Sequence, residues 1–375
     1  MAETHNRRSI FYVIAVMASL AVFVFIAMGI FLPLVKVNGG ESITVYNVVK
    51  EIIDFFKNIK DATFDKVVAI VSLVRSIIVI SLALALLVRV ILCFFKFIGK
   101  NLKNLFTAND YYGEDMISVC VQVAIFSMMM YAYYPSWDYD IGLAFMNLAA
   151  LLGIIIVAFL RVIEGLKSDT PGKAFIHAVL MFGVAVLIFV TISIGMHSPV
   201  ANAAGGPRIA MVDELTNYFT RVFSDFSKDV IVALIMQIVA LFLFFDAFKC
   251  MGSGVQYSLG CVKKSRWLKK QHKQKEYHFK TFLSTLLGLA FLVGAIILVI
   301  IKSEEAYGVK YVMGRTGIVS IILLSLALIL IIIAKYVKPK ENTYERAEAK
   351  EELAEQKEEE AVQQKIEELK KEQEN

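Results

Sequence analysis

The stretch VVAIVSLVRSIIVISLALALLVRVILCFFKFI, residues 67–98, decides the fold class of this chain. Its only charged residues are Arg75, Arg89 and Lys96, and apolar side chains fill most of the other positions. About 20 apolar residues in a helix are enough to cross the hydrocarbon core of a bilayer. The stretch exceeds that length, so it predicts a transmembrane helix.

Composition extends this prediction to the whole chain. Of its 375 residues, 58% are hydrophobic and only 19% are charged, and the mean hydropathy is +0.64. Soluble domains carry about 25% charged residues, and the strands of a β-barrel are short and alternating. We therefore predict an all-α polytopic membrane protein with eight transmembrane helices. The other seven cover residues 9–35, 116–134, 141–163, 174–196, 230–248, 281–301 and 311–337.

Basic residues predict the orientation of these helices. The loop at 251–280 carries many lysines and only one acid, Glu276, and Lys-rich and Arg-rich short loops stay in the cytoplasm. Counted from this loop around all eight spans, the other basic segments fall on the same side of the membrane. This places both termini in the cytoplasm. We expect a plasma membrane location, and the absence of N-x-S/T acceptors fits a bacterial inner membrane.

A repeated pattern of Pro and Gly residues predicts two tandem units. One set of Pro and Gly residues follows the first span, and a second set at one constant offset follows the fifth. Each precedes an expected outer amphipathic helix, at 42–60 and 209–227. An even number of spans per unit gives the copies parallel topology. Chance is the alternative, because Pro and Gly mark many helix ends. The sets are Pro33, Gly39 and Gly40, and Pro199, Gly205 and Gly206; the units are 1–166 and 167–340.

Polar residues inside the expected spans are the first candidates for a functional path. Arg75, Arg89 and Asp246 are charged, and Gln122 and Gln237 are neutral. Intramembrane charges usually face protein or water and mark ion or solute pathways. Alternatively, Arg89 and Asp246 form a structural ion pair, Arg75 extends to the interface, and the glutamines make interhelical hydrogen bonds.

Two cytosolic segments are candidates for binding. The basic loop combines cationic and aromatic side chains that suit anionic lipid headgroups, although the same composition also orients the chain in the membrane. Residues 341–375 hold 13 Glu and 6 Lys or Arg and favour a charged helical tail. A solvated helix, a weak coiled coil and contact with a protein partner are all compatible with it. The loop candidates are Lys263, Lys264, Arg266, Trp267, Lys269 and Lys270.

Signatures of catalysis are missing from the sequence. It contains no HExxH, GxSxG or Walker A motif, and its four cysteines lack zinc-site spacing. We therefore expect no catalytic residue, no cofactor and no metal. The basic surplus lies on alternate loops, which already explains it, so we expect no nucleic-acid partner.

These patterns predict a non-catalytic membrane interaction, scaffold or accessory protein. Its basic loop and acidic tail would contact lipid headgroups or partner proteins. The alternative is a transporter or channel that passes a small ion or solute between the two four-helix units.

Overall fold

The structure is a computed structural model of the whole chain, and not every segment of it is described. The described residues are 2–36, 42–59, 66–107, 113–134, 138–165, 170–194, 211–224, 226–262, 271–307 and 315–337. Eight long helices dominate them. These are α1 (Ala2–Phe31), α3 (Lys66–Thr107), α4 (Glu114–Tyr133), α5 (Ile141–Gly165), α6 (Pro171–Ile194), α8 (Lys228–Val262), α9 (Gln271–Tyr307) and α10 (Arg315–Tyr336).

Seven of these helices, all except α4, contain apolar segments long enough to cross a membrane. The prediction of a helical multi-pass membrane protein is therefore confirmed, whereas the count of eight spans stays a prediction. Some helices run well past the predicted ends. The 42 residues of α3 extend about 63 Å at 1.5 Å per residue, roughly twice the thickness of the hydrocarbon core.

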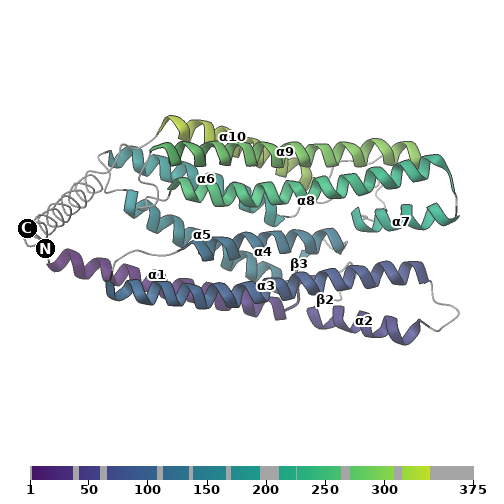
Figure 1. Ribbon diagram of the computed structural model, residues 1–375, viewed down its shortest axis with the longest axis horizontal. Coiled ribbons are helices and arrows are strands. Elements are labelled where there is room, and N and C mark those ends of the chain that lie inside the picture. Colours follow the sequence, from purple (N-terminus) through teal and green to yellow (C-terminus); the bar gives the residue numbers. More distant parts are fainter. Residues whose placement is uncertain are drawn as a thin grey trace, which may run out of the picture.

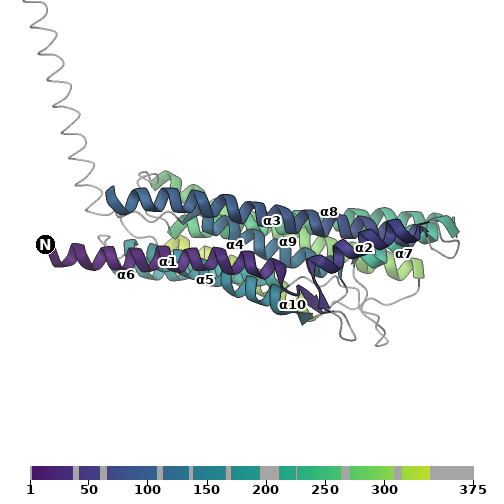
Figure 2. The ribbon, with the colours of Figure 1, turned by 90° about the horizontal axis from the view of Figure 1, so that it is seen from below.

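The long helices lie side by side along one axis (Figures 1 and 2). Helix α10 ends at the same end of the bundle at which α1 begins (Figure 1); we call this the terminal end and the opposite end the far end. Near the terminal end, the Tyr12 hydroxyl of α1 donates to the side-chain oxygen of Asn101 in α3 at 3.0 Å. Helices α1 and α3 are therefore antiparallel.

Each half of the chain forms a ring of four helices. In the first half, α1 and α4 each pack against both α3 and α5. In the second half, α6 and α9 each pack against both α8 and α10. The two rings meet where α4 contacts α6 and α8 and where α5 contacts α6 and α8. Helix α4 lies at this contact, so most of its apolar side chains are buried.

Two shorter helices of 14 residues each pack outside the rings, α2 (Val45–Asn58) on α3 and α7 (Met211–Ser224) on α8. Both lie toward the far end (Figures 1 and 2). In α2, Val48 is buried, but Val49 and Phe56 of the same apolar stripe are exposed. The face of α2 that packs on α3 is thus narrower than its apolar stripe.

A small antiparallel sheet joins the connections between helices of the first half. Strand β1 (Val35–Lys36) pairs with β2 (Ser42–Ile43) on one side and with β3 (Asp138–Tyr139) on the other. The sequence predicted helix as far as residue 35, but α1 ends at Phe31. Pro33 explains the difference, because proline disfavours helical geometry in the residue before it and supplies no backbone donor.

Asp140 links this sheet to the start of α5. Its carboxylate accepts hydrogen bonds from the Ser42 hydroxyl and, at 2.8 Å, from the backbone N–H of Ile141. These two donors, the Ser42 hydroxyl foremost, lower the pKa of Asp140 because they stabilise its charged form. The connection that follows α1 and the connection that precedes α5 are thereby held together.

Candidate functional site

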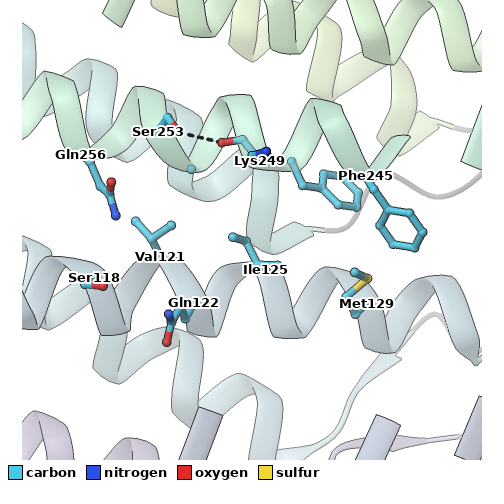
Figure 3. A pocket seen from close by; sticks show the side chains of 11 residues that line it. Ser118, Val121, Gln122, Ile125, Met129, Phe245, Lys249, Ser253 and Gln256 are labelled. Carbon is cyan, nitrogen blue, oxygen red and sulfur yellow. Dashed lines mark hydrogen bonds between the residues drawn. The ribbon is translucent and has the colours of Figure 1, made fainter. Parts of the chain in front are cut away.

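A groove of about 360 Å³ lies between α4 and α8, where the two halves of the chain meet (Figure 3). Its lining combines five polar side chains with apolar ones. The polar residues are Ser118, Gln122, Lys249, Ser253 and Gln256, and the others are Val121, Ile125, Met129, Phe245, Phe248 and Gly252.

The groove is polar at one end and apolar at the other. Helix α4 contributes Ser118 nearest the terminal end and Met129 farthest from it, while antiparallel α8 contributes Gln256 and Phe245 at the corresponding ends (Figure 3). Lys249 lies midway along the groove, level with Ile125, and the lining side chains farthest toward the far end, Met129 and Phe245, are apolar (Figure 3). The groove therefore has the polarity of an amphiphile, with its polar end toward the terminal end.

Gly252 sets how closely α4 and α8 approach at the floor of the groove. A Cβ atom at this position would lie 2.9 Å from Cγ1 of Val121 and 3.4 Å from Cδ1 of Ile125. Real Cβ atoms are almost never so close to another heavy atom as the first of these distances. Glycine at position 252 thus permits the close approach of α4 and α8 at the floor of the groove.

The charge of the groove is positive. Lys249 is exposed and lines the groove. Arg89 of α3, also exposed, donates from its guanidinium to Oγ of Ser118 at 3.2 Å, which places it at the rim. The lining contains no acidic residue. Among the described residues, no ion pair within 4.0 Å joins Lys249 to Asp246, one turn away on α8.

An ion pair borders the polar end of the groove. Nζ of Lys96 on α3 lies 3.0 Å from Oδ1 of Asp115 on α4, and the Asp115 side chain is only 7% exposed. Because this buried acid already faces its own lysine, it does not offset the charge of Arg89 and Lys249. The pair also locks the start of α4 against α3.

The structure brings together only part of the predicted pathway. Gln122 lines the groove and Arg89 sits at its rim. Asp246 is exposed on α8 and is not among the lining residues. The structure therefore joins Arg89 to Ser118, and the described residues contain no ion pair between Arg89 and Asp246.

Arg75 and Gln237 lie elsewhere. The Arg75 guanidinium stacks 5.2 Å from the ring centre of Tyr134, just after α4. The neighbouring Ser76 hydroxyl donates to the Glu51 carboxylate of α2 at 2.7 Å, so this part of α3 ties α2 and the end of α4 together. Gln237 lies on α8, is only 2% exposed, and is not among the residues that line the groove.

The predicted lipid-contact residues of the basic loop and the acidic tail lie outside the described residues. The loop residues are Lys263, Lys264, Arg266, Trp267, Lys269 and Lys270, and the tail is 341–375.

The sequence reasoning missed the α8 wall of the groove. It placed the end of the sixth span at residue 248, but α8 continues to Val262. Lys249, Ser253 and Gln256 therefore lie on one face of a continuing helix, and their spacing of four and three residues was the available signal.

A buried histidine pair was also missed. Nε2 of His177 on α6 lies 2.9 Å from Nε2 of His278 on α9, and the side chains are 101 residues apart in sequence. Within the described part of the chain, no three His, Cys, Asp or Glu side chains are placed to hold a metal ion. The pair therefore links two helices across the second ring.

Comparisons with protein families, with curated proteins and with solved structures found no match to this chain. Its function must therefore be inferred from the geometry and charge of its own residues.

Proposed function

We propose that this protein is a non-enzymatic membrane protein that acts by binding, and that the groove between its halves is its interaction site within the membrane. The observation that carries the proposal is the division of the groove into a polar part that runs from Ser118 to Lys249, with Arg89 at its rim, and an apolar end at Met129 and Phe245. The basic residues at 263–270, between α8 and α9, and the acidic tail 341–375 would add contacts with lipid headgroups or partner proteins on the cytoplasmic side.

The proposed topology has eight crossings, with α4 as the eighth. Its 20 residues extend about 30 Å, the thickness of the hydrocarbon core. It starts beside Lys96 and ends beside Arg75, which are about 31 Å apart along α3. An even number of crossings returns the C-terminus to the side of the N-terminus, and the basic loops make that side cytoplasmic, in a bacterial inner membrane by our proposal.

The contact pattern supports two tandem units, 1–166 and 167–340. Each neighbour contact of the first ring has a counterpart in the second, and the outer helices α2 and α7 occupy equivalent places. The groove would then lie between duplicated units, where the two copies of a repeat commonly form a binding site.

A binding role is supported by the chemistry of the lining. Two hydroxyls, two amides and one ammonium group offer hydrogen bonds and charge. None of the lining residues is a His, Asp, Glu or Cys that would serve as a general base or an activated nucleophile.

Photo-crosslinking in native membranes tests the proposal. A benzophenone amino acid would replace Gln122 or Gln256 in the groove and, as a control, Ile322, a 59% exposed residue on α10. We expect discrete adducts from both groove positions that the control does not give. Identical diffuse adducts from all three positions would show that the groove is not a binding site. A chain ending at Lys340 would reveal partners that depend on the tail.

A transporter is the second candidate, because the groove lies between the two halves and carries polar groups at its terminal end. In proteoliposomes, Arg89→Ala should then change solute or ion flux while the amount of folded protein stays the same. No flux from the parent protein for a panel of small ions and solutes would leave the binding role alone.

A further inference from the structure

We infer that the groove holds one anionic phospholipid, with its phosphate at the cationic end and an acyl chain along the apolar end. This inference rests on the proposed function, because it names the molecule that the interaction site would bind. It depends on four properties of the groove: its charge, its donors, its apolar end and its surroundings.

The polar end matches a phosphate group. Phosphate oxygens form their strongest hydrogen bonds with ionised donors. The Arg89 guanidinium lies at the rim of this end, and Lys249 lies midway along the groove, where the polar part of the lining begins. The hydrogen bond from Arg89 to Ser118 uses one of the five N–H donors of the guanidinium. The amides of Gln122 and Gln256 supply uncharged donors beside the two cations. Positive charge at this end disfavours a cation as occupant.

The apolar end matches an acyl chain. Met129 and Phe245 line its far part, and Ile125 and Phe248 lie between them and the polar part, level with Lys249. Methionine adapts well to a flexible hydrocarbon chain. A free anion such as phosphate would leave this half of the groove empty. A ligand that fills both ends must carry a charged head and an apolar tail.

The surroundings favour entry from the bilayer. On α8, Phe242 lies one turn beyond Phe245 and is 66% exposed, and on α3, Leu92 lies one turn from Arg89 and is 61% exposed. In a membrane helix such exposed apolar side chains face lipid. The groove volume of about 360 Å³ is near the lower end of ligand pockets, about 300–1,000 Å³. It therefore accommodates the phosphate region and part of one acyl chain, while the rest of that chain and the second chain stay in the bilayer.

Lipid retention by the purified full-length protein tests this inference. Native mass spectrometry would follow titrations with phosphatidylglycerol and with phosphatidylcholine of the same acyl chains. We expect the parent protein to bind the anionic lipid about tenfold more tightly, as one charge-assisted contact would provide. Lys249→Gln should remove most of this preference. The matched control, Lys335→Gln, changes an exposed lysine on α10 and should leave it unchanged.

A second variant guards against a folding defect. Gln256→Glu puts a negative charge at an exposed position of the polar end. It should weaken phosphatidylglycerol binding about as much as Lys249→Gln and leave phosphatidylcholine binding unchanged. Equal retention of both lipids by the parent protein, or equal loss in the Lys249 and Lys335 variants, would overturn the inference.

Three further outcomes distinguish a failure of this inference from a failure of the proposed function. Displacement of phosphatidylglycerol by millimolar inorganic phosphate would show that the groove recognises the phosphate alone, against the chain-binding half of the inference. Discrete groove crosslinks to a protein, without a lipid preference, would overturn the lipid and leave the interaction site standing. No discrete crosslink and no effect of Lys249→Gln would overturn both.

Discussion

Replacing Gly142 with alanine should loosen the contact between α1 and α5, because the added methyl group has no space there. Its Cβ would lie 2.6 Å from the carbonyl oxygen of Pro33, 2.8 Å from that of Gly29 and 3.0 Å from that of Leu32. All three contacts are with backbone atoms, which cannot rotate away as the tip of a side chain can. Either the start of α5 or the end of α1 must shift.

The size of the effect follows from three terms. Overpacking a tight contact costs about 1–3 kcal/mol. A shift would also weaken the hydrogen bond from the Gly142 N–H to the Pro33 carbonyl, 2.7 Å long, which contributes about 1 kcal/mol. Alanine recovers up to about 1 kcal/mol of helix propensity. The net destabilisation is about 1–3 kcal/mol.

Thermal unfolding in mild detergent measures this change. A fluorogenic thiol reagent would report unfolding, because Cys93, Cys120 and Cys261 are buried in the folded protein. At about 2 °C per kcal/mol for a chain of this size, Gly142→Ala should lower the melting midpoint by about 2–6 °C. The matched control is Gly99→Ala on α3, where an added Cβ meets nothing within 4 Å; it should leave the midpoint unchanged or raise it slightly.

A midpoint for Gly142→Ala at or above that of the parent protein would refute the reasoning, because the close approach of α1 and α5 would then not exist in the folded molecule. An equal fall of the melting midpoint in Gly99→Ala would show that the effect comes from replacing a helical glycine in general.

Three further predictions use the same melting assay. Asp115→Asn removes the charge that faces Lys96 and should cost about 1 kcal/mol, since the lysine is 54% exposed and water still solvates it; an unchanged midpoint would show that the pair is only a surface contact. Single replacements of His177 and His278 by phenylalanine should each destabilise the protein, and the double replacement should cost at least about 0.5 kcal/mol less than their sum; strict additivity would show that the two histidine side chains do not interact. The pKa of Asp140 is lowered in the folded protein. The Asp140 carboxylate therefore stabilises the folded protein above about pH 4, and this contribution is lost as the pH falls through the pKa of the folded state. Asp140→Asn should therefore lower the midpoint at pH 7 and reduce its fall between pH 5 and pH 3; parallel pH profiles would contradict this.

The wall of the groove on α8 shows where sequence reasoning stopped short. The charge at Lys249 and the polar residues after it resemble the end of a span, so residues 249–256 were expected in a loop. Helix α8 instead continues, because its backbone hydrogen bonds do not depend on an apolar surface and its polar side chains face the groove. The spacing of Lys249, Ser253 and Gln256 fits one helix face, but three polar residues are too few to distinguish a continuing helix from a loop.

The sequence by itself determined that this is a helical multi-pass membrane protein and located its apolar helices. That much is local, because a bilayer requires every backbone polar group to be satisfied within its own helix over a known length. Only the tertiary structure decides which polar side chains lie next to each other. Arg89 reaches Ser118, and His177 reaches His278 across 101 residues. Such pairs depend on the rotation and register of neighbouring helices, which close contacts such as Gly252 against Val121 set through shape complementarity.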